Sequence, residues 1–119
     1  MAALERATFR FERGELGKAE AAFREAMASG NSEVVPVAAI GLGNALQDQG
    51  RLEEAAAAYR VALDDREHGG LAAFSLGTVL RAEGRADEAE AAFRQAMASG
   101  SLDALGPALG LFARLRSAH

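Results

Sequence analysis

The chain has 119 residues, no cysteine and a formal net charge of −4 at pH 7. The lack of cysteine excludes a disulfide framework, a thiolate zinc site and a cysteine nucleophile, and the acidic balance argues against a nucleic-acid partner, whose phosphates attract clustered lysine and arginine. No apolar run approaches the roughly 18 residues of a membrane-spanning helix and the N-terminus has no signal-peptide core, so we expect a cytoplasmic protein.

Apolar residues recur at helical spacing along nearly the whole chain, and no stretch alternates with period two. The spacing predicts seven helices that end at glycines and polar turn residues. Gly14, Gly50 and Gly84 should end the first, third and fifth helices, and Gly69 and Gly70 should break the chain before the fifth. The expected bounds are about 3–12, 16–29, 35–49, 52–65, 71–83, 86–99 and 103–117.

An internal repeat of 34 residues runs through the chain. Residues 42–62 and 76–96 carry the same pattern: a Leu-Gly pair, a turn glycine, then an alanine, an aromatic residue and a second alanine, all 34 positions apart. Residues 17–30 and 87–100 are identical at 11 of 14 positions, at an offset of 70. A period near this length is typical of stacked helix pairs.

The Leu42-Gly43 and Leu76-Gly77 pairs, the turn glycines and the Ala-aromatic-Ala spacing resemble the tetratricopeptide repeat in its bacterial form. The resemblance implies an all-α fold, a right-handed solenoid of antiparallel helix pairs. It divides a single domain, residues 1–119, into repeats at about 1–33, 34–69 and 70–102 and a terminal helix at 103–117. The first repeat lacks the Leu-Gly pair.

Gly43 and Gly77 fall inside predicted helices, where each costs up to about 1 kcal/mol relative to alanine. We expect the backbone of the second helix of each pair to cross there, too close for a Cβ atom. Phe23, Tyr59 and Phe93 are expected to fill the gaps between successive repeats.

No residues suggest an enzyme. Gly41 and Gly43 superficially resemble a nucleotide-binding loop, but no strand precedes them and a third glycine is missing. The two histidines, His68 and His119, have no neighbours at metal-ligand spacing and are expected to be solvated. We therefore expect no catalytic, cofactor-binding or metal-binding residue.

In tetratricopeptide arrays the first helix of each pair lines a concave groove that binds peptides. The resemblance therefore implies a scaffold or adaptor for a protein or peptide. Asn44 matches an asparagine with which chaperone-binding members hold a carboxylate, but Ile40 replaces their lysine and Phe9 takes the place of the asparagine in the first repeat, so that clamp is not expected. Alternatively, the side chains on this concave side bind nothing and only fill a tightly curved superhelix. The groove candidates are Phe9, Ile40, Asn44, Gln47, Asp48, Phe74, Thr78 and Arg81.

The last predicted helix is apolar on two sides. Leu109 and Phe112 should cover the third repeat, whereas Leu111 and Leu115 point away from it. Because a terminal solenoid helix normally has a polar outer face, either further helices follow in a longer protein or this surface pairs with another copy. The alternative function is thus a module that dimerises through Leu111 and Leu115, or a fragment of a larger regulatory protein, with no ligand in its groove.

Overall fold

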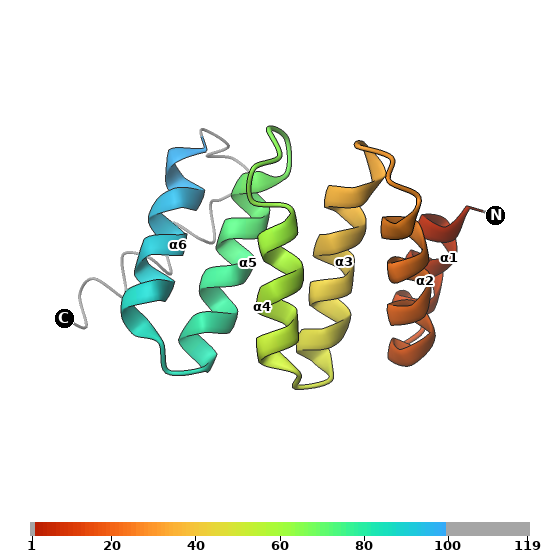
Figure 1. Cartoon of the computed structure of the whole chain (residues 1–119). Coiled ribbons are helices and arrows are strands. Elements are labelled where there is room, and N and C mark those ends of the chain that lie inside the picture. The colour runs from red at the N-terminus through yellow and green to blue at the C-terminus, as the bar shows by residue number, and fades with distance from the viewer. Residues whose placement is uncertain (1, 100–119) are drawn as a thin grey trace.

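The computed structural model describes residues 2–99, and this part of the chain contains six helices and no strand (Figure 1). The all-α prediction is confirmed, while the expected seventh helix, at 103–117, lies outside the described residues. The helices are α1 (Ala3–Glu12), α2 (Leu16–Ala28), α3 (Val34–Asp48), α4 (Leu52–Val61), α5 (Gly69–Ala82) and α6 (Ala86–Ala98).

The helices stand side by side in chain order, and each packs mainly against its neighbours in the sequence (Figure 1). We call α1, α3 and α5 the A helices and α2, α4 and α6 the B helices. The A helices also contact one another, α1 with α3 and α3 with α5, whereas no comparable contact joins the B helices within residues 2–99. The A helices therefore line the inner side of a solenoid of helix pairs, and we call their exposed surface the A-helix face.

The turn inside each pair has the geometry that its glycine predicts. Gly50 has a φ of 77°, in the left-handed region, and its N–H donates to the carbonyl of Gln47 while the N–H of Arg51 donates to that of Leu46. This arrangement is a Schellman motif, which satisfies the last carbonyls of a helix. Gly84 repeats it between α5 and α6, with a φ of 79°.

The connection between α4 and α5 differs from the expectation. Helix α4 ends at Val61 rather than near residue 65, and α5 begins at Gly69 rather than at Leu71. The N–H groups of Ala62 and Leu63 donate three residues back, to Tyr59 and Arg60, which ends α4. Oδ2 of Asp65 then accepts the backbone N–H groups of Glu67 and His68 and so stabilises the turn before α5.

Gly69 and Gly70 do not break the chain but form the first turn of α5, where they allow close packing. A Cβ atom at Gly69 would meet the carbonyl of Leu63, and one at Gly70 would meet the hydroxyl of Ser99. These two positions therefore require glycine for its small size rather than for a special backbone conformation.

Gly43 and Gly77 are both buried inside helices, as the sequence predicts, but their neighbours are not helix backbones. A Cβ atom at Gly43 would overlap the ring of Tyr59, and one at Gly77 would lie 2.7 Å from Cε1 of Phe93. The expectation of a crossing backbone was wrong, because the B-helix ring lies against the glycine, between the two backbones. Tyr59 and Phe93 thus pack on the A helix of their own repeat.

Unlike Tyr59 and Phe93, Phe23 has no glycine opposite it in its own repeat. When the turn glycines Gly14 and Gly50 are aligned, the first repeat has Ala7 where the second has Gly43. The ring of Phe23 packs instead against Gly41 on α3, where a Cβ atom would overlap it. Phe23 therefore joins the first repeat to the second, as expected from the sequence.

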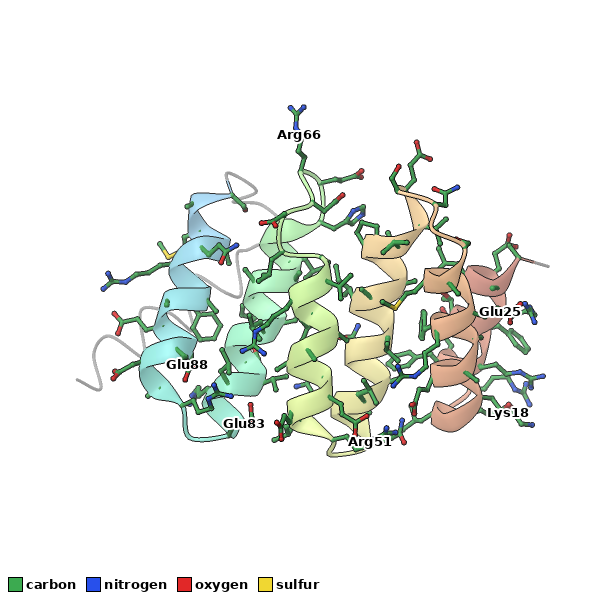
Figure 2. All side chains as sticks on the ribbon, viewed as in Figure 1. Lys18, Glu25, Arg51, Arg66, Glu83 and Glu88 are labelled. Carbon is green, nitrogen blue, oxygen red and sulfur yellow. The ribbon has the colours of Figure 1, made fainter. Side chains whose placement is uncertain are left out.

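A network of charged side chains also joins these two repeats at the turn between α3 and α4, where Figure 2 labels Arg51. Arg51 pairs with Glu20 at 2.7 Å and with Glu54 at 2.6 Å. Burial works against ionisation of Glu20, but hydrogen bonds from Gln49, Arg51 and Arg24 outweigh it and hold the pKa of Glu20 below its ordinary value. Ion pairs as well as apolar contacts thus join the first and second repeats.

Candidate functional site

The A-helix face contains a cleft of about 220 Å³ between α1 and α3. Its volume lies below the roughly 300–1,000 Å³ of small-molecule sites, so it suits one inserted side chain rather than a cofactor. We call it the α1–α3 cleft. Its lining residues are Leu4, Thr8 and Phe11 from α1, Phe23 from α2, and Val37, Ile40, Gly41 and Asn44 from α3.

Tyr59, on the B helix α4, orients the polar side chains at this cleft. The hydroxyl of Tyr59 lies 2.6 Å from Oδ1 of Asn44 and 2.9 Å from Oε1 of Gln47. A phenol has one proton and can donate to only one of these oxygens at a time. Both amides are nevertheless oriented by the same buried ring, so the structure brings together two of the groove candidates.

Asp48 completes this polar group. It is exposed at the end of α3. Burial raises the pKa of the Tyr59 phenol and the negative charge of Asp48 raises it further, while a hydrogen bond with Ser75 lowers it. Tyr59 therefore stays a neutral donor at physiological pH.

Of the two apolar candidates on α3 and α5, Ile40 is 6% exposed and lines the cleft wall. Phe74 is half-buried, and its ring lies 5.7 Å from that of Phe93. Both side chains thus take part in the packing of the repeats, as one of the two interpretations of these residues expects.

The remaining candidates on α5 lie apart from the cleft. Thr78 is half-buried, and its hydroxyl donates to the carbonyl of Phe74 at 3.1 Å. Arg81 is exposed and forms no ion pair within residues 2–99. These two residues continue the A-helix face into the third repeat but do not line the α1–α3 cleft.

Phe9 does not line the cleft either. Its side chain is 48% exposed, and the guanidinium carbon of Arg13 lies 5.4 Å from the ring centroid. The residue of α1 that lies opposite Asn44 is Thr8, which lines the cleft. The sequence could have shown this, because aligning Gly14 with Gly50 places Thr8, not Phe9, at the position of Asn44.

Three further residues line the cleft that were not among the groove candidates: Leu4 and Phe11, which form the α1 wall, and Phe23, which reaches the cleft from α2. The helical spacing of Leu4 and Phe11 was a usable signal, since residues seven apart share a helix face. The place of Phe23 between the first two repeats was expected, but its contact with Gly41, which brings the ring to the cleft, was not. The dimer candidates Leu111 and Leu115 lie outside the described residues.

A second cleft, of about 280 Å³, opens on the opposite layer between α2 and α4. Met27, Leu42 and Val61 provide its apolar surface, while Arg24 and Glu54 form its rim. These two charges lie 3.9 Å from each other. The charges around this α2–α4 cleft are therefore already neutralised within the molecule.

His68 is not simply solvated, contrary to the expectation. Its Nδ1 lies 2.9 Å from Oδ2 of Asp65, in the turn before α5. Across residues 2–99 no three histidine or carboxylate side chains gather in a way that could hold a metal ion. Over the same residues, no helix is both long and apolar enough to cross a bilayer.

The comparisons with known proteins agree with this architecture. The family model of the tetratricopeptide repeat-like domain matches residues 1–111 of the chain. A comparison with curated proteins gave no match.

Proposed function

The chain belongs to the tetratricopeptide repeat-like family, a family of helical repeat modules that often mediate protein interactions, and from this premise we propose that its A-helix face binds a peptide or helix of a partner protein. The role is that of a non-catalytic scaffold or adaptor, and the partner is a protein rather than a nucleic acid or a membrane. The α1–α3 cleft is the observation that carries the proposal.

Three features of the cleft support a peptide ligand. Its floor and walls are apolar, since Leu4, Phe11, Phe23 and Ile40 line it, and such a surface gains free energy when a partner side chain covers it. Its volume fits a single anchor residue. Asn44 supplies polar groups at the rim, in an orientation that the Tyr59 hydroxyl stabilises, and pre-ordered groups lose little entropy on binding.

The test begins with a selection of random short peptides displayed on phage against the whole chain. The affinity of the selected peptides is then measured for two matched variants. Thr8→Tyr fills the α1–α3 cleft, and Ala57→Tyr fills the α2–α4 cleft, since Thr8 and Ala57 are both exposed residues that line these two clefts.

We expect Thr8→Tyr to weaken binding at least about tenfold, which corresponds to about 1.4 kcal/mol, and Ala57→Tyr to leave it unchanged. Circular dichroism of both variants controls for folding. A loss of affinity in Ala57→Tyr alone would place the binding surface on the B helices and refute the proposal, as would a selection that enriches no peptide.

The alternative function, self-association through Leu111 and Leu115, stays a hypothesis from the sequence because no described residue bears on it. Sedimentation of the parent chain and of Leu111→Glu/Leu115→Glu separates the two. A concentration-dependent mass in the parent that the double variant abolishes would support the dimer, and a monomeric parent would exclude it.

A further inference from the structure

Three carboxylates border the α1–α3 cleft without an ion-pair partner. Glu5 and Glu12 lie one helical turn before and after Thr8, and Asp48 lies one turn beyond Asn44. All three are exposed, and within residues 2–99 none takes part in an ion pair or a side-chain hydrogen bond. Because the two A helices run in the same direction, Glu12 and Asp48 lie at the same end of the cleft.

The basic residues of the first two repeats are occupied elsewhere. Arg6 pairs with Glu25, and Arg10 and Arg13 both pair with Glu15. Arg24 and Arg51 belong to the network that joins α2 to α4. In residues 2–69 the exceptions are Arg60, which is exposed on the B helix α4, and Arg66, which is exposed in the turn before α5. The A-helix face of these two repeats therefore presents Glu5, Glu12 and Asp48 as carboxylates that no ion pair within residues 2–99 neutralises.

This charge pattern stops at the third repeat. The position that corresponds to Glu12 and Asp48 is Ala82 on α5, and the position of Gln47 is taken by the exposed Arg81. The negative region thus coincides with the cleft instead of covering the whole A-helix face. On the opposite layer, the rim of the α2–α4 cleft is neutralised by the pair of Arg24 and Glu54.

We propose, building on the function proposed above, that the ligand of the α1–α3 cleft is a cationic peptide segment: one apolar side chain enters the cleft, and lysine or arginine residues beside it pair with Glu12 and Asp48. Complementary charge both speeds association and favours the correct partner. A nucleic acid would be repelled by the same carboxylates, and a second copy of this chain also has a formal net charge of −4.

The experiment measures the binding of defined peptides to the full chain by fluorescence anisotropy. The probe is a short capped peptide with a central leucine flanked on both sides by lysines. Its matched controls carry glutamine or glutamate in place of every lysine, and a fourth peptide keeps the lysines but replaces the leucine with serine. The lysine–leucine peptide should bind at least about tenfold more tightly than the glutamine version at low salt, and the difference should shrink as added salt screens the charges.

Two double variants with the same change in net charge locate the effect. Glu12→Gln/Asp48→Asn removes the carboxylates beside the cleft, while Glu53→Gln/Asp87→Asn removes exposed carboxylates without ion pairs on the B helices. The first pair should abolish most of the advantage of the lysine peptide, and the second pair should retain it. An equal loss in both variants would mean that only the net charge of the protein matters, and the proposal would fall.

The results also separate the preference for a cationic peptide from the broader proposal that the cleft binds a peptide. If lysine and glutamine peptides bind equally and Thr8→Tyr abolishes both, the cleft binds peptides but the cationic preference is wrong. Tighter binding of the glutamate peptide would refute the preference for lysine. Undiminished binding of the peptide with serine in place of leucine would refute the apolar anchor in the cleft. If none of the peptides binds, including those from the display selection, both proposals fail.

Discussion

The hydroxyl oxygen of Tyr59 lies 2.6 Å from Oδ1 of Asn44, so a buried ring on a B helix fixes an amide at the rim of the α1–α3 cleft. The same ring packs against Gly43, where a Cβ atom would overlap it. One residue thus carries out two tasks, the packing of the second repeat and the orientation of a polar group on the A-helix face. Each task can be removed separately.

Tyr59→Phe keeps the ring and removes only the hydroxyl. We expect the free energy of unfolding to fall by about 0.5–1.5 kcal/mol, the usual net value of one hydrogen bond. Urea unfolding of Tyr59→Phe, Asn44→Ala and the double variant measures the coupling between the two residues. If the double variant loses the full sum of the two single losses, the hydrogen bond does not stabilise the fold.

Gly77→Ala introduces a Cβ atom 2.7 Å from the ring of Phe93. The gain in helix propensity, at most about 1 kcal/mol, is smaller than the usual cost of overpacking, about 1–3 kcal/mol, so we expect a net loss of stability. Gly17→Ala is the control, because α2 has nothing within 4 Å of that Cβ position and should become slightly more stable. Equal thermal midpoints for the two variants would contradict the packing described for α5 and α6.

Acid should destabilise the fold through the carboxylates that are paired in it. The pKa of Glu20 is held below its ordinary value, as are those of Glu54 beside Arg51 and of Asp65 beside the backbone N–H of His68. A carboxyl group whose pKa is lower in the folded state than in the unfolded state stabilises the fold when it is ionised. This stabilisation is complete above the pKa of the unfolded state, about 4.3 for glutamate and 3.9 for aspartate. It is lost as the pH falls through the pKa of the folded state.

We therefore expect the urea midpoint to stay level between about pH 6 and 7 and to fall below about pH 4.5. Glu20→Gln should lower the midpoint at neutral pH and flatten the acid decline. Glu53→Gln, at a position without an ion pair, should follow the parent. An acid profile of Glu20→Gln that is parallel to that of the parent would show that the Glu20 network does not contribute.

The turns at Gly50 and Gly84 differ in the residue before the glycine, and this difference predicts a stabilising change. Oε1 of Glu83 is buried without a hydrogen-bond partner, 3.8 Å from Nη1 of Arg85, near the end of α5 labelled in Figure 2. The equivalent residue in the second repeat is Gln49, whose Nε2 donates to the carbonyl of Ala45 at 3.1 Å. Glu83→Gln should reproduce this bond with Val79 and raise the free energy of unfolding by about 0.5–1 kcal/mol.

The reverse change, Gln49→Glu, is the matched control for Glu83→Gln. It would place a second carboxylate beside Glu20, to which Gln49 donates, and we expect it to destabilise the protein. If Glu83→Gln proves less stable than the parent in urea, the ion pair with Arg85 outweighs the missing hydrogen bond.

Periodicity and turn chemistry were sufficient to predict most of the fold. The spacing of apolar residues and the glycines at Gly14, Gly50 and Gly84 placed α1, α2, α3 and α6 within one residue of their observed bounds. The connection between α4 and α5 was not predictable in this way, because Asp65 caps the turn with a side chain and Gly69 is selected by its neighbour Leu63 rather than by its backbone conformation. Such tertiary causes leave no periodic signal.

The site was harder to predict than the fold. The repeat register placed Ile40 and Asn44 on the A-helix face, where both line the α1–α3 cleft. Phe9 was chosen where Thr8 lies, since the first repeat is offset by 36 residues rather than 34. The charges beside the cleft could not be recognised from composition either. Whether Glu12 and Asp48 are available to a partner depends on where the arginines pair, and those pairs join residues far apart in the sequence, such as Arg51 and Glu20.

The proposed function requires that a partner binds the A-helix face at the α1–α3 cleft. Its most direct test is a titration of the isotope-labelled chain with the lysine–leucine peptide, followed by amide chemical shifts. The account predicts that the largest shifts occur at Thr8, Gly41 and Asn44, which line the cleft, with little change at Ala57 and Val61 in the α2–α4 cleft. Largest shifts at Ala57 and Val61, with Thr8 and Asn44 unmoved, would contradict it.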